Sequence, residues 1–161
     1  MAKVIGPPSS ADLYEEDFPR WAERQAELLR AGRFDALDLD RLIEEVADLG
    51  VSERKAVFSH ARELLQHLLK LEFSPAEWPR RGWLESVVSQ RTDLDERLTA
   101  TLRRQLQAAL PEVYARARRD AARSLKHDRV AEDALPIGCP YSLDQILDPD
   151  WLPANHHGLR E

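Results

Sequence analysis

Apolar residues recur at helical spacing along almost the whole chain, and this periodicity limits the fold more than any other feature. The clearest stripe lies in residues 53–72, where side chains three or four positions apart share one helix face. Its members are Val57, Phe58, Ala61, Leu64, Leu65, Leu68 and Leu69. No stretch keeps the alternation of apolar and polar residues that is typical of a half-buried strand. The sequence therefore predicts an all-α fold.

Capping residues divide the first half of this pattern into three helices. Asp17 is a suitable N-cap for the first helix, and Gly32 is suited to the left-handed position that follows its last turn. The segment 50–52 contains a glycine and a potential serine cap, and it separates a second helix (38–48) from the third (53–72). A link this short joins antiparallel neighbours, so we expect a helix 2/helix 3 hairpin inside a helical bundle.

The second half of the chain predicts two further long helices and one short helix. The fourth helix is expected to start near Trp83 and the fifth near Thr101. Pro111 lies inside the fifth pattern and should kink or split it, because proline lacks the backbone donor. Ser142 and Gln145 have the spacing of a capping box, which predicts a short C-terminal helix. The whole pattern thus predicts a bundle of four to five main helices.

Length and composition indicate one domain with a heavily charged surface. The 161 residues are 43% hydrophobic and 32% charged, which is enough apolar material for one core. We expect a flexible N-terminal arm (1–12), a single all-helical domain (13–151) and a C-terminal tail (152–161). The adjacent histidines His156 and His157 in that tail are expected to be disordered.

Charge and the cysteine count bear on the compartment and the partners. No apolar run approaches the roughly 18 residues of a membrane span, and the N-terminus lacks the apolar core of a signal peptide. Cys139 is the single cysteine, so an intramolecular disulfide cannot form. A cytoplasmic protein without a membrane partner is therefore expected. The net charge of −6 argues against nucleic acid as a partner.

His67 lies on the border of the leucine stripe, between the predicted core and the surface. Glu63 lies one turn before it and Lys70 one turn after it. A histidine in that position can bind a carboxylate through one ring nitrogen and offer the other to a ligand or metal. The simpler interpretation is a border histidine that pairs with Glu63 or with a carboxylate on a neighbouring helix.

Five polar residues could line a pocket inside the bundle, namely Asp17, Glu45, His67, Lys70 and Arg91. In that case Asp17 or Glu45 is a base or metal ligand, His67 an acid, base or ligand, and the two cations bind an anion. Glu45 and His67 are the candidates for a divalent metal, but no spacing typical of a metal site accompanies them. We therefore predict no cofactor, with a divalent metal as the alternative.

A tryptophan-arginine segment follows the third helix and is a candidate recognition loop. Its residues are Trp78, Arg80, Arg81 and Trp83, within a segment (73–82) that contains two prolines. Indole and guanidinium groups stack well and are enriched where proteins bind one another. The alternative is a loop whose tryptophans only fix it to the end of the bundle.

Six separated segments resemble a known bacterial family in their order along the chain. They are LYEEDFPRW (13–21), LLRAGRFDALDLDRLIEEVADLG (28–50), LLQHLLKLEFSP (64–75), RGWLESVVSQR (81–91), EVYARAR (112–118) and CPYSLDQIL (139–147). The family is domain of unknown function 29, frequent in cyanobacteria and proteobacteria. The resemblance covers about residues 13–151 and implies an all-helical bundle with no assigned activity. The polar residues typical of the family fall here on Asp17, Trp21, Glu45, His67, Lys70, Trp83, Arg91 and Cys139.

Two functions remain open from the sequence. The first is a non-enzymatic protein-interaction or regulatory module that binds a protein partner or forms a homo-oligomer, because no recognised catalytic spacing occurs. The second is an enzyme, or a small-ligand or metal-binding protein, that uses the polar pocket of five residues. Convergence of those residues on one concave space would favour the second function.

Overall fold

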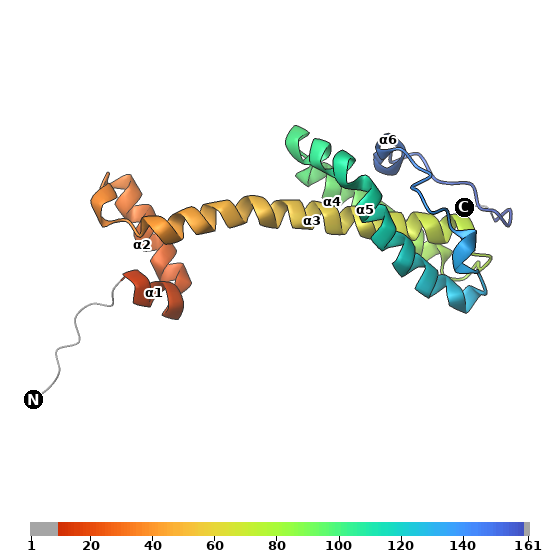
Figure 1. Cartoon of the computed structure of the whole chain (residues 1–161), viewed down its shortest axis with the longest axis horizontal. Helices are drawn as coiled ribbons and strands as arrows, with labels where there is room; N and C mark the ends of the chain where they lie inside the picture. Colours follow the sequence, from red (N-terminus) through yellow and green to blue (C-terminus); the bar gives the residue numbers. More distant parts are fainter. Residues whose placement is uncertain (1–9, 160–161) are drawn as a thin grey trace, which may run out of the picture. The chain divides into compact units, whose positions relative to one another are not determined.

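The computed structural model describes residues 10–159, and all regular secondary structure in this part of the chain is helical (Figure 1). The predicted all-α helical bundle is confirmed. The elements are α1 (Ser10–Glu16), α2 (Phe18–Arg30), η1 (Phe34–Ala36), α3 (Leu39–Phe73), α4 (Arg80–Arg97), α5 (Ala100–Leu125), η2 (Lys126–Asp128), η3 (Glu132–Ala134) and α6 (Leu143–Leu147). A search of the described helices finds none with the length and apolarity that a membrane crossing requires.

The helices belong to two compact units, Met1–Val51 and Ser52–Glu161. The first unit contains α1, α2, η1 and the start of α3, and the second unit contains the remainder. The single domain predicted over residues 13–151 stays a prediction. Helix α1 includes residues 10–12 of the predicted N-terminal arm, and residues 1–9 of that arm lie outside the described part.

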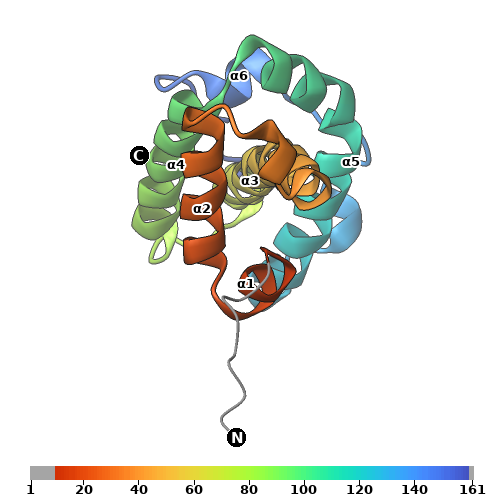
Figure 2. The ribbon, with the colours of Figure 1, turned by 90° about the vertical axis from the view of Figure 1, so that its left-hand side faces the viewer.

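Figure 2 shows the ribbon of α2 in the first unit. Local capping explains where this helix begins and ends. The side chain of Asp17 accepts a hydrogen bond from the backbone N–H of Arg20 at 3.2 Å, which satisfies one of the free donors at the helix start. Pro19 lies in the first turn, where its missing donor costs nothing. Gly32 follows the helix with a φ of +67°, a conformation that glycine adopts without strain. The predicted start and end of this helix are both confirmed.

The core of the first unit is small and rests on Trp21. Its side chain is buried, and its indole Nε1 donates to a carboxylate oxygen of Asp38 at 3.3 Å. The backbone N–H of Asp38 in turn donates to the buried side chain of Gln25 at 2.9 Å. Tyr14 and Phe18 pack around the indole, with ring centroids 5.0 and 5.5 Å from it. These contacts fix α1, α2 and the start of α3 as one unit.

The second unit has the larger core, and its centre is the predicted leucine stripe. Six of the seven stripe residues are buried, and Phe58 is half-buried against them. Burying a leucine side chain completely contributes about 2 kcal/mol. The stripe packs against side chains from α4, α5 and the C-terminal segment, among them Val87, Leu94, Leu106, Tyr114, Leu125 and Ile146.

The predicted helix 2/helix 3 hairpin is wrong, because α3 is one helix from Leu39 to Phe73. Gly50 and Ser52 lie inside it and do not form a link. Glycine costs a helix only about 1 kcal/mol relative to alanine, which the helix-forming residues on both sides outweigh. Gly32 and Gly158 are the described glycines with positive φ, so Gly50 has an ordinary right-handed backbone.

Two boundaries in the second unit also differ from the expected ones. Helix α4 begins at Arg80, three residues before Trp83. Helix α5 is capped by Thr99, whose side chain accepts from the N–H of Leu102 at 3.2 Å, and not by Thr101. Pro111 lies within α5, which is therefore not split there. The capping box that starts α6 is confirmed, with both of its hydrogen bonds present.

Candidate functional site

The first unit has an apolar groove between α2 and the start of α3, which we call the α2/α3 groove. Its volume is about 270 Å³. Eight of its ten lining residues are apolar: Phe18, Trp21, Ala22, Ala26, Leu29, Leu42, Val46 and Leu49. Gln25 and Glu45 complete the lining. Concave sites lined mostly by apolar side chains with few polar groups are typical of binding sites.

Large aliphatic side chains remain exposed along this face of α3. Ile43, Val46 and Leu49 are 58%, 62% and 68% exposed, and they are spaced three residues apart. Phe18 and Leu29 of α2 are also exposed in large part. Contiguous apolar patches of several hundred Å² on a folded unit mark interaction sites. Helix periodicity brings Ile43, Val46 and Leu49 to one side of α3. Val46 and Leu49 line the α2/α3 groove together with Phe18 and Leu29 of α2.

Two residues of the predicted polar pocket lie in the first unit, and both have local partners. Asp17 caps α2. Glu45 accepts a hydrogen bond from the hydroxyl of Tyr14 at 2.5 Å, which raises the pKa of that tyrosine. Arg41 lies 4.2 Å from the centre of the Tyr14 ring. Glu45 therefore orients α1 on α3 while it forms part of the wall of the α2/α3 groove.

His67 lies in the second unit, with its side chain 13% exposed. Its Nδ1 is buried without a hydrogen-bond partner, and its Nε2 is 4.0 Å from the Glu63 carboxylate, beyond hydrogen-bonding distance. Burial, and secondarily the charge of Lys70, lowers the pKa of His67 to about 4. The imidazole is thus neutral at neutral pH. It therefore carries no positive charge that would attract the Glu63 carboxylate, the partner that the sequence suggests.

Lys70 and Arg91, the other two predicted pocket residues, are also buried in the second unit. Burial lowers the pKa of Lys70, and its ammonium group lies 5.8 Å from the centre of the Trp83 ring, within the range of a cation–π contact. Arg91 donates to backbone carbonyls of the C-terminal segment, at 2.9 Å to Ile146 and 2.8 Å to Trp151. Its donors are therefore used by the protein's own backbone.

The candidate metal ligands, Glu45 and His67, fall in different units. Among residues 10–159 there is no group of three or more histidine, cysteine or acidic side chains that could hold a metal ion. His60 contacts Gln90, with its Nδ1 2.7 Å from the amide oxygen, and lies 3.7 Å from Asp93. Of the predicted pocket residues, Asp17 caps a helix, Glu45 accepts from the Tyr14 hydroxyl and Arg91 binds backbone carbonyls. The buried Nδ1 of His67 has no hydrogen-bond partner.

The predicted recognition loop is shorter than expected, because α3 ends at Phe73 and α4 begins at Arg80. Trp78 is 96% exposed, and Arg81 is exposed with an ion pair to Glu85 at 3.0 Å. Arg80 is buried and donates to the carbonyl of Leu71 at 2.9 Å. Trp83 packs against the core. Two of the four residues therefore face solvent, and two hold the bundle end together.

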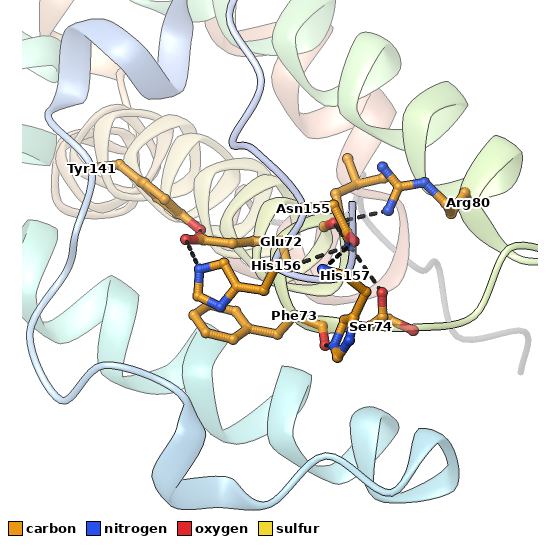
Figure 3. Close-up of polar contacts among 9 residues, drawn as sticks. Glu72, Phe73, Ser74, Arg80, Tyr141, Asn155, His156 and His157 are labelled. Carbon is orange, nitrogen blue, oxygen red and sulfur yellow. Dashed lines mark hydrogen bonds and ion pairs between the residues drawn. The ribbon is translucent and has the colours of Figure 1, made fainter. Parts of the chain in front are cut away.

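A polar cluster at the C-terminal end of α3 is absent from the sequence predictions (Figure 3). The carboxylate of Glu72 accepts a hydrogen bond from the Tyr141 hydroxyl and lies 3.2 Å from the His156 Nε2. The His156 ring also packs edge-on against Phe73, with centroids 4.5 Å apart. Burial and the Glu72 hydrogen bond both raise the pKa of Tyr141.

Asn155 and His157 extend this cluster along the helix end (Figure 3). The Asn155 amide donates to the carbonyls of Leu71 and Ser74 at 2.7 and 2.9 Å, and His157 Nε2 lies 3.2 Å from the Phe73 carbonyl. The last carbonyls of a helix lack intrahelical hydrogen-bond donors. Here Asn155 and His157 of the C-terminal segment contact these carbonyls. The predicted disorder of His156 and His157 is therefore wrong. The only local sequence signal is Asn155 followed by a glycine three residues later.

The fold and these surfaces define the chain as an all-α protein. Its first unit has an open apolar groove, and in its second unit the C-terminal segment is hydrogen-bonded to the helical bundle. The family model described as "Domain of unknown function DUF29" matches residues 13–152, nearly the whole chain. The chain therefore belongs to the DUF29 family, which confirms the resemblance found in the sequence. Comparisons with curated proteins and with solved structures each find no match.

Proposed function

We propose that the protein is a non-enzymatic interaction module and that the α2/α3 groove is its binding surface. The observation that carries this proposal is the row of exposed aliphatic side chains Ile43, Val46 and Leu49 beside a concave apolar floor. Exposing such a face to water is unfavourable, by about 25 cal/mol for each Å² of apolar area. Binding of a partner that covers this face would be stabilised by the burial of its apolar area. The α2/α3 groove provides a concave surface for such a partner.

The occupant that fits is an amphipathic helix of another protein with lysine or arginine flanking its apolar face. The stretch from Leu42 to Leu49 covers about two helical turns, roughly 10 Å of axis, and a helix in a groove contacts its site through residues at that spacing. Residues 1–51 contain twelve acidic and six basic side chains and so carry the whole net charge of −6. A cationic helix is attracted to that charge, whereas a second copy of the acidic unit is repelled.

We place this module in the cytoplasm of a bacterial cell. The single cysteine, Cys139, suits a reducing compartment because it needs no disulfide partner. Burial raises the pKa of this thiol, which makes it a poor nucleophile at neutral pH. The alternative function, an enzyme or ligand-binding protein that uses Asp17, Glu45, His67, Lys70 and Arg91, stays a prediction.

Peptide binding to the full chain tests the proposal directly. The probe is a fluorescein-labelled peptide of about fourteen leucine and lysine residues in an amphipathic helical pattern, with a second peptide that has glutamate at each lysine position. Fluorescence anisotropy should show saturable binding of the lysine peptide and at least tenfold weaker binding of the glutamate peptide. Equal affinities for the two peptides would contradict the charge argument.

Two matched valine variants locate the binding surface. Val46→Glu places a carboxylate in the groove and should weaken binding of the lysine peptide about tenfold or more, because burial of an unpaired charge is costly. Val88→Glu is the control, since Val46 and Val88 are 62% and 63% exposed on different units. Equal losses in the two variants would place binding elsewhere. A dimer in sedimentation velocity that Val46→Glu dissociates would assign the groove to a second copy and overturn the proposed partner.

A further inference from the structure

A second groove lies wholly within the second unit, between α3 and α5, and we call it the α3/α5 groove. Its volume is about 370 Å³, within the range of sites that bind small molecules. Its apolar lining consists of Phe58 on α3 and of Ala109 and Val113 on α5. Val113 is buried, while Phe58 and Ala109 are half-buried at the edge of the core. A flat apolar group could lie against this floor without entering the core.

Cations distinguish this groove from the one in the first unit. Arg54, Lys55, Arg62 and Arg116 all line it, against a single carboxylate from Glu112. Arg62 lies 3.8 Å from the carboxylate of Asp120 and is partly neutralised by it. In the part of the chain that the structure describes, Arg54, Lys55 and Arg116 have no ion pair. Three exposed cations around one apolar floor give the groove a positive potential.

This potential is local and does not follow from the composition of the second unit. Residues 52–161 contain seventeen acidic and seventeen basic side chains, so this unit is neutral as a whole. A local excess of cations in a concavity concentrates anions there, because the low-dielectric walls focus the field. The groove combines that field with the planar guanidinium groups of Arg54 and Arg116, which bind carboxylate and phosphoryl oxygens in pairs.

We propose that the α3/α5 groove binds a small organic anion, an apolar body that carries a carboxylate or phosphoryl group. The body lies against Phe58, Ala109 and Val113, and the anionic group is held at the rim by Arg54 or Arg116. Ser59 also lines the groove, and in the proposed complex its hydroxyl is a neutral donor to the anion. This site is separate from the α2/α3 groove and does not depend on the proposed protein partner.

Amide-shift mapping by NMR on the ¹⁵N-labelled full chain tests this site. The probes are 1-naphthyl phosphate and 1-naphthoate, and the neutral comparison is 1-naphthol, which has the same ring system. Both anions should shift the amides of Phe58, Ser59, Ala109 and Val113 in a saturable manner. Naphthol should bind at least about fivefold more weakly, since it lacks the charge that the arginines recognise. Shifts confined to other regions, or no binding at millimolar concentrations, would overturn the proposal.

A pair of double variants separates the groove from general surface charge. Arg54→Gln with Arg116→Gln should weaken the affinity for 1-naphthyl phosphate at least about fivefold. The control is Arg104→Gln with Arg119→Gln, which removes the same charge from exposed positions of α5 outside the groove. An equal loss in the control would reduce the effect to non-specific attraction and contradict the site. A polyglutamate peptide that shifts the groove amides while both naphthyl anions fail would also overturn the proposal, in favour of an acidic protein segment.

Discussion

The guanidinium of Arg91 in α4 donates from Nε to the backbone carbonyl of Ile146 in α6, over 2.9 Å and across 55 residues of sequence. The same side chain reaches the carbonyls of Trp151 at 2.8 Å and Pro149 at 3.4 Å. Helix α6 ends at Leu147, so its last carbonyls lack intrahelical partners. Arg91 therefore binds the C-terminal segment to the bundle.

Replacing Arg91 should destabilise the second unit even when the positive charge is kept, because the guanidinium hydrogen bonds are lost. Arg91→Lys keeps the charge but loses the planar set of donors, and we expect a loss of about 2 kcal/mol in the free energy of unfolding. Urea denaturation followed by circular dichroism measures it. Arg104→Lys is the control, because Arg104 is exposed on α5. A loss no larger than in the control would show that the carbonyls are satisfied without the guanidinium.

His67 should make stability depend on pH in the acid range. The unfolded chain binds a proton at the usual pKa of about 6.5, whereas burial lowers the pKa of His67 in the folded protein to about 4. Between these values the unfolded state holds more protons, so stability falls as the pH decreases from 6.5 to 4, by up to about 3 kcal/mol. Above pH 7 the group has no effect, because it is neutral in both states.

The variant His67→Leu isolates this contribution. Its free energy of unfolding should change less between pH 7.5 and pH 4.5 than that of the wild type, when both are measured by urea denaturation. At pH 7.5 the variant should be at least as stable as the wild type, because Nδ1 is buried without a partner. His127→Leu, at an exposed position, should keep the wild-type profile. Parallel pH profiles for His67→Leu and the wild type would contradict the shifted pKa.

Helix positions were predictable where the signal lies within one or two turns. Asp17 and Ser142 each cap the helix that their local sequence indicated, and the leucine stripe of α3 forms the core. Gly50 and Ser52 show the limit of this reasoning, because the same residue types also occur inside helices when the flanking segments favour one helix. A capping signal says that a helix can start there, not that the preceding helix must end.

The candidate sites were harder to predict than the helices because burial depends on distant segments. The sequence predicts Arg80 on a recognition surface, but Arg80 is buried and donates to the Leu71 carbonyl at the end of α3. Asn155 contacts the same carbonyl from 84 residues away. No periodicity or spacing links these residues in the sequence, and their pairing follows only from the return of the chain to the end of α3.

Asn155 should stabilise the packing of the C-terminal segment against the end of α3. Its amide donates to the carbonyls of Leu71 and Ser74. Asn155→Ala therefore removes the donor to the Ser74 carbonyl and leaves the Leu71 carbonyl with Arg80 alone. We expect a loss of about 1–2 kcal/mol and faster hydrogen exchange in residues 153–159, measured by mass spectrometry. His127→Ala, at an exposed site, should change neither quantity. Unchanged exchange in Asn155→Ala would mean that His156 and Glu72 hold the segment without it.

Gly50→Ala should stabilise the protein, because Gly50 lies inside α3 with a right-handed backbone and an added Cβ would meet no atom within 4 Å. Alanine restricts the unfolded chain and favours the helix, which should raise the free energy of unfolding by about 0.5–1 kcal/mol. The matched substitution Gly32→Ala should have the opposite sign, with a loss of about 1 kcal/mol. Gly32 also has open space around it, but its φ of +67° strains any residue with a Cβ.

Urea denaturation of both variants beside the wild type measures the two changes in the free energy of unfolding. A loss in Gly50→Ala like that in Gly32→Ala would mean that the chain turns at Gly50, as the sequence alone suggested, and would contradict a continuous α3.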